Sequence, residues 1–193
     1  MNHSGRVAKH LGRLGNKMEF ESTPISGAYI VRMNKIKDER GFFARLFCQE
    51  EFKAQGLADS VVQANLSHNT HTGTVRGMHY QTSPALETKL VRCIRGSILD
   101  VIVDLRPQSD TYRKHYAVTL NENSDTALFV PTLCAHGFQT LEPNTDVFYM
   151  VSGAYQPDSE RGLRHDDPAL GINWPRQTDH ISSKDQQWPL LTD

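Results

Sequence analysis

The chain has 193 residues, with 21 Lys and Arg against 22 Asp and Glu, so its formal net charge is −1. A chain of this length can bury roughly 70% of its extended surface around one core. The balanced charge gives no overall field that would attract nucleic acid or an anionic membrane, and no apolar run is long enough to span a bilayer. We therefore expect a globular protein with neither nucleic acid nor membrane as a partner.

The first 17 residues form a basic segment. They contain four Lys or Arg and no acid, and their longest apolar run is two residues. A run this short excludes the hydrophobic region of a secretory signal. We predict a disordered N-terminal extension over residues 1–17, with an ordered arm as the alternative, and a single domain over residues 18–193.

From residue 27 onward, short runs rich in Val, Ile, Phe, Tyr and Thr are separated by Gly, Pro, Asn or Asp. Runs of this composition and length are typical of β-strands. Their close spacing predicts an all-β sandwich or barrel formed in one piece. The predicted strands are 28–33, 42–47, 61–66, 74–80, 88–94, 97–105, 115–120, 128–130, 137–141 and 147–152.

Three features predict what lies between and after these strands. Residues 49–55 form the one clear helical segment before the C-terminal region, and a second short helix is expected near Asp185. Gly96 separates two long strands and predicts a hairpin turn. After Tyr155 the chain becomes rich in Pro, Asp, Gly and Trp, so this tail is expected to wrap over the barrel and not to form a domain.

The three cysteines, Cys48, Cys93 and Cys134, lie far apart in the sequence and form no CxxC pair. Cys93 and Cys134 lie within apolar runs. This distribution predicts buried, reduced thiols in a cytoplasmic protein, with disulfides as the alternative.

His79 is the first candidate for chemistry, because histidine exchanges a proton near neutral pH. It lies inside a predicted strand, and its side chain would face the barrel interior if Val75 and Gly77 share its alternation. The alternative is a hydrogen-bonded core histidine. Arg76 and Lys89 nearby favour a site, because an ordinary apolar core would not gather these cations.

Lys89 and Tyr149 are the next candidates. Alternation over residues 89–93 places Lys89 on the same side of its strand as Val91 and Cys93, which predicts an inward lysine. The alternative is a surface lysine whose ammonium reaches solvent. Tyr149 is either a core tyrosine with a satisfied hydroxyl or a proton donor.

A metal site is the competing interpretation of the histidines. Metal centres of jelly-roll barrels need a His-x-His pair, a later Glu and a third His from a distant strand. Here His79 is followed by Tyr80 and Gln81, which leaves His136, next to the predicted strand 137–141, as the second candidate ligand. Two ligands are too few for a closed site, so we predict no metal.

Six segments occur in order across residues 19–192, and they are DERGFF (38–43), VRGMHYQ (75–81), KLVRC (89–93), DVIVDLR (100–106), AHGF (135–138) and DDP (166–168). Together they resemble the dTDP-4-dehydrorhamnose 3,5-epimerase family. The resemblance implies a jelly-roll cupin with short peripheral helices that forms a homodimer by strand exchange. It also implies a nucleoside diphosphate 4-keto-6-deoxy sugar as substrate, with no metal and no organic cofactor.

The resemblance also assigns roles by position. It makes His79 the catalytic base and Asp185 the carboxylate that orients this base. It places Lys89 beside the C4 oxygen of the sugar and makes Tyr149 the proton donor on the opposite face. The positions that contact substrate in the family are Arg40, Gln63, Asn65, Arg76, His136, Glu160 and Lys184.

Three departures from the family pattern bear on the substrate. Arg45 stands where relatives commonly carry a glutamate, and Ala64 replaces a common aspartate. Both lie in the part of the site associated with the nucleotide. Cytosine N3 and the guanine O6 and N7 edge accept hydrogen bonds from a guanidinium, so Arg45 predicts a CDP- or GDP-linked substrate if it enters the base pocket. The alternative is that Arg45 faces solvent or pairs with a nearby acid. The segment 149–155 also differs from the usual family sequence.

Three hypotheses for the function remain after this comparison of residues. The first is a cofactor-free epimerase acting at C3, C5 or both of a nucleotide-linked 4-keto sugar, in the synthesis of a deoxysugar for a surface polysaccharide or a secondary metabolite. The second is a non-catalytic cupin that binds a sugar nucleotide or supports another sugar enzyme. The third is a keto-sugar isomerase on the same fold, for which Tyr149 is less necessary.

Overall fold

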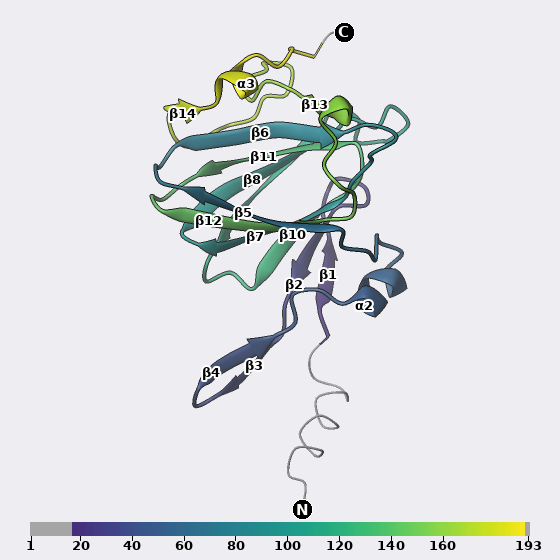
Figure 1. Ribbon diagram of the computed structural model, residues 1–193, viewed down its shortest axis with the longest axis vertical. Coiled ribbons are helices and arrows are strands. Elements are labelled where there is room, and N and C mark those ends of the chain that lie inside the picture. Colours follow the sequence, from purple (N-terminus) through teal and green to yellow (C-terminus); the bar gives the residue numbers. More distant parts are fainter. Residues whose placement is uncertain (1–16, 192–193) are drawn as a thin grey trace, which may run out of the picture.

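The computed structural model describes residues 17–191 as two facing antiparallel sheets with a small hairpin beside them (Figure 1). The first sheet has the strand order β1 (Glu19–Ser22), β2 (Tyr29–Arg32), β10 (Thr126–Val130), β7 (Lys89–Arg95), β12 (Thr145–Val151) and β5 (Gln63–Asn69). The second has the order β13 (Glu160–Gly162), β6 (Thr74–Gln81), β11 (Cys134–Thr140), β8 (Ser97–Asp104) and β9 (His115–Asn121), with β14 (His180–Ile181) parallel to β6.

Little helix accompanies these sheets. The described residues contain α2 (Gln49–Ala54), a short 3₁₀ turn (Pro157–Ser159) and α3 (Ser183–Gln186). The prediction of an all-β jelly-roll sandwich with short peripheral helices is therefore confirmed. No helix of the described part is long and apolar enough to cross a membrane. The extension predicted for residues 1–17 lies outside the described residues, apart from Lys17.

Apolar side chains form three clusters, one between the two sheets and one on the outer face of each sheet. The central cluster joins the inner faces of both sheets through residues such as Val91, Ile102 and Phe138. A second cluster forms around Phe52, which α2 packs against the outer face of the first sheet. A third cluster, which includes Met78, covers the outer face of the second sheet with the C-terminal segment. The predicted tail therefore does wrap over the barrel.

The turn at Gly96 is not a hairpin as predicted. It connects β7 to β8, and these strands belong to different sheets, so the chain crosses here from one layer to the other. Gly96 has φ of +73°, and a Cβ at this position would collide with Thr145. Hydrophobic periodicity shows that two strands flank a glycine, but it does not show whether they pair with each other.

The strands β3 (Lys35–Asp38) and β4 (Gly41–Ala44) form a separate hairpin that projects away from the sandwich (Figure 1). Its apolar side chains are unusually exposed, at 57% for Phe42 and 61% for Phe43. A projecting hairpin with exposed aromatic side chains is typical of a contact surface.

Cys93 and Cys134 are buried, and all three cysteines, including the half-buried Cys48, are unpaired. Burial raises the pKa of Cys93 and of Cys134 to about 12 in each case. The prediction of buried, unpaired thiols is confirmed for these two residues, and their burial makes them unreactive at neutral pH.

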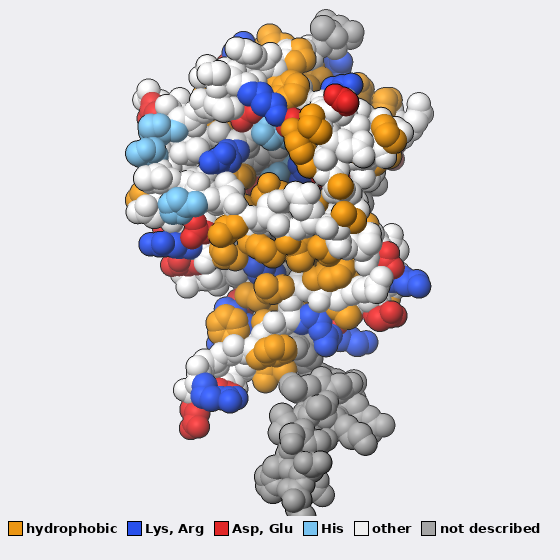
Figure 2. Space-filling view, in the orientation of Figure 1, with side chains coloured by type: hydrophobic (Ala, Val, Ile, Leu, Met, Phe, Trp, Pro, Cys, Tyr) orange, Lys and Arg blue, Asp and Glu red, His pale blue; other side chains and the backbone are white. Residues whose placement is uncertain are grey.

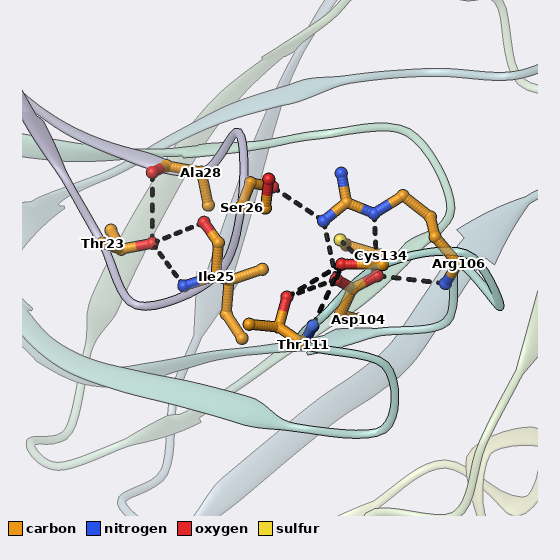
Figure 3. Close-up of polar contacts among 9 residues, drawn as sticks. Thr23, Ile25, Ser26, Ala28, Asp104, Arg106, Thr111 and Cys134 are labelled. Atoms are coloured by element: carbon orange, nitrogen blue, oxygen red, sulfur yellow. Dashed lines mark hydrogen bonds and ion pairs between the residues drawn. The ribbon is translucent and has the colours of Figure 1, made fainter.

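A buried carboxylate fixes the loop between β1 and β2 to the end of β8 (Figure 3). Arg106 donates to both oxygens of Asp104 at 2.7 Å, and Ser109 and Thr111 add hydroxyl donors at 2.6 and 2.7 Å. The same guanidinium donates to the carbonyl of Ser26 at 2.7 Å. Burial by itself would raise the pKa of Asp104, but the hydrogen bonds from Arg106 and the hydroxyls hold it well below its usual range.

Asp104→Asn should lower the free energy of unfolding by about 3 kcal/mol at neutral pH, because Arg106 loses its buried counter-charge. The folded-state pKa of Asp104 lies below its unfolded value of about 3.9, so this stabilisation is present above that pH and declines as the pH falls toward the folded pKa. Urea unfolding of both proteins at about pH 7 and about pH 3 should show a narrower gap in acid. A gap of the same size at both values would assign the loss to packing.

Candidate active site

A register shift between β6 and β11 places several polar side chains on one side of the second sheet. His79 pairs with His136, whereas Arg76 pairs with Phe138, so β6 uses one more residue than β11 between these two pairs. The shift occurs at Gly77, where a Cβ would lie 2.5 Å from the Cα of the facing glycine. The alternation predicted for this strand is therefore broken, and Arg76 comes onto the side of His79.

His79 is held by a carboxylate from the far end of the chain. The parallel pairing of β14 with β6 brings α3 over β6, and Asp185 Oδ1 lies 2.7 Å from His79 Nε2. The hydroxyl of Ser182, at the N-cap of α3, accepts a hydrogen bond from the Asp185 amide, and the Gly77 amide donates to Asp185 Oδ2. Burial by itself would raise the pKa of Asp185. The hydrogen bond to His79, the charge of His79 and the contacts with Gly77 and Ser182 lower this pKa below its usual value.

The cleft beside this pair has two cavities, of about 720 and about 170 Å³, and His79, Lys89 and Tyr149 line both. Lys89 begins β7 and Tyr149 lies on the neighbouring β12, so both face His79 from the opposite sheet. The three side chains therefore mark the junction of the two cavities.

Lys89 and Tyr149 share Glu87 as a charged neighbour. The Lys89 ammonium donates to the carbonyl of His79 at 3.2 Å and forms an ion pair with Glu87 at 3.4 Å. Burial raises the pKa of Tyr149, and Glu87 raises it further, whereas Arg76 lowers it. A phenol with a raised pKa is protonated at neutral pH, which a proton donor requires.

The remaining side chains predicted to contact substrate divide between the two cavities, with two exceptions. Arg76, His136 and Lys184 line the larger cavity. Gln63, Asn65 and Glu160 line the smaller one. Within the smaller cavity the Gln63 amide donates to Asn65 at 2.8 Å, which fixes both side chains.

Ion pairs and hydrogen bonds orient these residues. His136 Nε2 lies 2.7 Å from Asp100 Oδ1, and both residues are buried. Lys184 donates to Glu160 at 2.5 Å. Burial alone would raise the pKa of Glu160, but Lys184 and the hydroxyl of Tyr155 hold it below its usual value.

The two exceptions are Arg40 and Arg45, which do not reach the cleft of their own chain. Arg40 is at the turn of the projecting hairpin, pairs with Asp38 and is 83% exposed. Arg45 follows β4 and forms an ion pair with Glu51 of α2. The structure therefore brings together ten of the twelve predicted site residues and leaves these two arginines apart.

The sequence analysis missed other residues that line the cleft, and it missed Asp100, which holds His136 from behind the cleft. Glu87 lines the smaller cavity, and its position two residues before Lys89 was the available signal. Asp100 is an acid inside an apolar run, which is itself a sign of a buried partner. His68 and His180 line the larger cavity and had no signal, because no periodic pattern connects them.

No group of three or more His, Cys, Asp or Glu side chains in residues 17–191 is arranged to hold a metal ion. In His79 and in His136, one ring nitrogen is already hydrogen-bonded to a carboxylate. What the cleft offers instead is a histidine–carboxylate pair, a lysine and a protonated phenol around one space. This set can remove a proton from carbon, stabilise the resulting anion and return a proton.

Comparison with known proteins agrees with this chemistry. The sequence profile described as dTDP-4-dehydrorhamnose 3,5-epimerase matches residues 22–193. The enzyme of that name from Sinorhizobium fredii is 41% identical over 177 residues, which are 91% of each chain.

Two crystal structures show the same architecture. The dTDP-4-dehydrorhamnose 3,5-epimerase of Bacillus anthracis, with TDP and PPi bound, is 36% identical, and the match covers 91% of this chain and 100% of that one with a TM-score of 0.87. The dTDP-6-deoxy-D-glucose-3,5-epimerase of Legionella pneumophila, in complex with dTDP-4-keto-L-rhamnose, is 34% identical and covers 90% and 93% with a TM-score of 0.84. This chain belongs to the dTDP-4-dehydrorhamnose 3,5-epimerase family and is an isomerase of nucleotide-linked sugars.

Proposed function

We propose that the protein epimerises a nucleoside diphosphate 4-keto-6-deoxy sugar at C3, C5 or both, with His79 as base and Tyr149 as acid. The observation that carries the proposal is the junction of the two cavities, where the His79–Asp185 pair faces Lys89 and Tyr149 from the opposite sheet. A base and an acid on opposite walls of one cleft are what inversion at a carbon requires.

The first step is removal of a proton from carbon. The C4 ketone of the substrate acidifies the protons on C3 and C5, so a neutral imidazole can take one if the enolate oxygen is stabilised. Lys89 supplies a fixed cation for that oxygen, and its contact with the His79 carbonyl keeps it beside the base. A preorganised donor of this kind contributes on the order of 3 kcal/mol.

Asp185 acts on this step through His79. Its carboxylate bonds to Nε2, so the nitrogen that remains for the substrate is Nδ1. The carboxylate also stabilises the imidazolium that forms after proton abstraction. The carboxylate is kept ionised by the contacts that lower its pKa. Asp185 is therefore a positioning residue whose charge favours the forward proton transfer.

The second step returns a proton from the other side of the ring. Tyr149 is half-buried and protonated, and it lies on the sheet that faces His79. Donation of its phenolic proton to C3 or C5 of the enolate inverts that carbon. A sugar nucleotide also carries a diphosphate, for which Arg76, His136 and Lys184 are the candidates in the larger cavity.

The function is tested by incubating the protein in heavy water with dTDP-, CDP- and GDP-linked 4-keto-6-deoxy sugars. NMR and mass spectrometry then report which of the three sugar nucleotides gains deuterium and at which carbon. Exchange with inversion at C3 or C5 supports the proposal, and the preferred donor identifies the nucleobase. Movement of the carbonyl without inversion would identify a keto-sugar isomerase, and binding without any exchange would identify a non-catalytic sugar-nucleotide protein.

Activity is expected to survive exhaustive chelation, because His79 and His136 are too few to hold a catalytic metal. Protein treated with EDTA and then with a chelating resin should keep its full rate, and metal analysis of the active protein should find no stoichiometric transition metal. A rate that falls on chelation and returns with one added metal would contradict the proton-transfer scheme.

We also propose that the protein works as a strand-exchanged homodimer, with Arg40 of one chain entering the cleft of the other. Figure 2 shows hydrophobic side chains gathered in a band across the middle of the face that it displays. The edge strand β5 exposes Leu66, and the neighbouring Val62 is 58% exposed, while the projecting hairpin exposes Phe42 and Phe43. An edge strand and a projecting hairpin that both expose large apolar side chains are complementary surfaces for exchange between two copies.

Complementation distinguishes exchange from a side-by-side dimer. Arg40→Ala and His79→Asn homodimers should each be impaired, but refolding them together should restore about a quarter of the wild-type sites, because half of the dimers are mixed and one site in each is intact. His79→Asn refolded with Tyr149→Phe is the matched control, since both changes lie in the barrel and no intact site forms. Recovery equal to this control would exclude exchange of the hairpin.

We also propose where in the cell the protein works. We place the protein in the cytoplasm, where the buried thiols Cys93 and Cys134 stay reduced.

Arg45 forms its ion pair with Glu51 within its own chain. It can therefore help to select the nucleobase only if the hairpin of one chain is exchanged into the other chain of the dimer. The role is tested by repeating the heavy-water experiment on Arg45→Glu with the dTDP-, CDP- and GDP-linked sugars.

A further inference from the structure

Glu87 is a half-buried carboxylate in the smaller cavity, beside Lys89, and the mechanism above gives it no role. Its side chain is 11% exposed, as is that of Lys89, and Glu87 Oε1 lies 3.4 Å from the Lys89 ammonium. Glu87 also lines the smaller cavity together with Tyr149. A carboxylate in this place opposes binding of a negatively charged substrate, so a contribution to binding does not explain it.

The chain holds Glu87 firmly against the strand that carries Tyr149. The amide of Thr88 donates to the Ser152 hydroxyl at 2.9 Å, and the amide of Ser152 donates to the Thr88 carbonyl at 3.1 Å. Next to Ser152, a Cβ on Gly153 would lie 2.7 Å from the carbonyl of Leu86. Glycine at that position therefore allows the Glu87 segment to pack closely against the end of β12.

Glu87 offsets positive charge around Tyr149. The charged and titratable groups that line the cleft with Tyr149 are His68, Arg76, His79, Tyr80, Glu87, Lys89, His136, Tyr155, Glu160, His180, Lys184 and Asp185. A nearby cation favours the phenolate form of tyrosine, and Arg76 does lower the pKa of Tyr149. Burial and then Glu87 act in the opposite direction and raise this pKa.

Glu87 also limits where the Lys89 ammonium can point. An ammonium has three N–H donors. One donates to the His79 carbonyl and another is directed at Glu87, which leaves a third for the cleft. Without Glu87, two donors would be free, and the ammonium could approach the phenol instead of the oxygen that becomes negative during the reaction.

We propose that Glu87 is a positioning residue that aims Lys89 at the reacting oxygen and extends to higher pH the range in which Tyr149 can act as a proton donor. This inference rests on the proposed function, because it assigns Tyr149 the role of acid. It predicts that loss of the Glu87 charge affects return of the proton more than its removal. It also predicts that nucleotide binding is not weakened, because a charge that opposes the substrate has been removed.

The test uses Glu87→Gln, with Glu87→Asp as the variant that retains the charge. Glu142→Gln is the matched control, because it makes the same change at an exposed turn outside both cavities. Deuterium wash-in and inversion are measured against pH, with the Kd for dTDP and the thermal midpoint. In Glu87→Gln the alkaline limb of the inversion rate should move down by about one pH unit, while the limb for wash-in stays in place. The Kd should be equal or lower, and Glu87→Asp should restore most of the profile.

A second measurement does not depend on the substrate. The 13Cζ signal of Tyr149 in 13C-tyrosine-labelled protein, assigned by its loss in Tyr149→Phe, gives the pKa of the phenol directly. This pKa should fall by about one pH unit in Glu87→Gln and stay unchanged in Glu142→Gln. An unmoved signal would overturn the inference even if no sugar nucleotide were turned over. A parallel loss of wash-in, inversion, dTDP binding and thermal midpoint would also overturn it, because those changes together indicate a structural role.

Wild-type protein assayed alongside separates the two proposals. If the wild type incorporates deuterium into none of the three sugar nucleotides, the proposed function fails. The NMR titration still decides whether Glu87 raises the pKa of Tyr149. If the wild type is active and the Glu87→Gln profile and titration match it, the inference about Glu87 fails and the proposed function stands.

Discussion

His79→Asn should abolish deuterium exchange at both C3 and C5, with a loss of at least about 10³-fold, because the variant has no group that can accept the proton. The expectation rests on the position of His79, which lies at the junction of the cavities and is bonded to Asp185. Asparagine is close in size and its amide can still donate to this carboxylate. The fold should therefore be preserved, and dTDP should bind with nearly unchanged affinity.

The measurement is NMR of the sugar nucleotide in heavy water, with calorimetry for dTDP binding. His115→Asn is a suitable control, because His115 starts β9 and lines neither cavity. Exchange at the wild-type rate in His79→Asn would remove His79 from the mechanism. Loss of dTDP binding or of the thermal transition would instead show that the substitution had damaged the structure.

The strands that the sequence predicted are those whose side chains face a core. β7, β8 and β12 contain long apolar runs and occur within one or two residues of the predicted ranges. β1, β3, β13 and β14 were missed because they are short and mostly polar, with sequences such as KIKD in β3 and ERG in β13. Such strands form because a neighbouring strand offers hydrogen bonds, and this information is absent from their own composition.

The site was predictable only where the chemistry is local. Lys89 was correctly placed on the side of Val91 and Cys93, because β7 alternates regularly. The shared side of Arg76 and His79 follows from a register shift, which depends on the pairing of β6 with β11. Asp185 lies 106 residues from His79 in sequence, so its assignment came from the family resemblance and not from any pattern in the chain.

Removal of the Tyr149 hydroxyl should separate exchange from inversion. In Tyr149→Phe the base, its carboxylate and the lysine remain, so His79 can still remove a proton and return deuterium to the same face. Inversion needs an acid on the other wall of the cleft, and phenylalanine has no proton to give. We therefore expect deuterium wash-in near the wild-type rate, with product formation slower by about 10²-fold or more.

The alternative for Tyr149 is a packing role, since the ring lies against the central apolar cluster. Phenylalanine keeps the ring, so a packing role predicts no change in either rate, whereas an acid role predicts loss of inversion alone. Tyr116→Phe is the matched control, because Tyr116 packs against the same cluster and lines neither cavity. If wash-in and inversion fall together in Tyr149→Phe, the hydroxyl contributes to binding or to enolate formation and not to protonation of the opposite face. A burst of exchanged but uninverted substrate would be direct support for the acid role, because it shows an enolate that forms and returns by the same face.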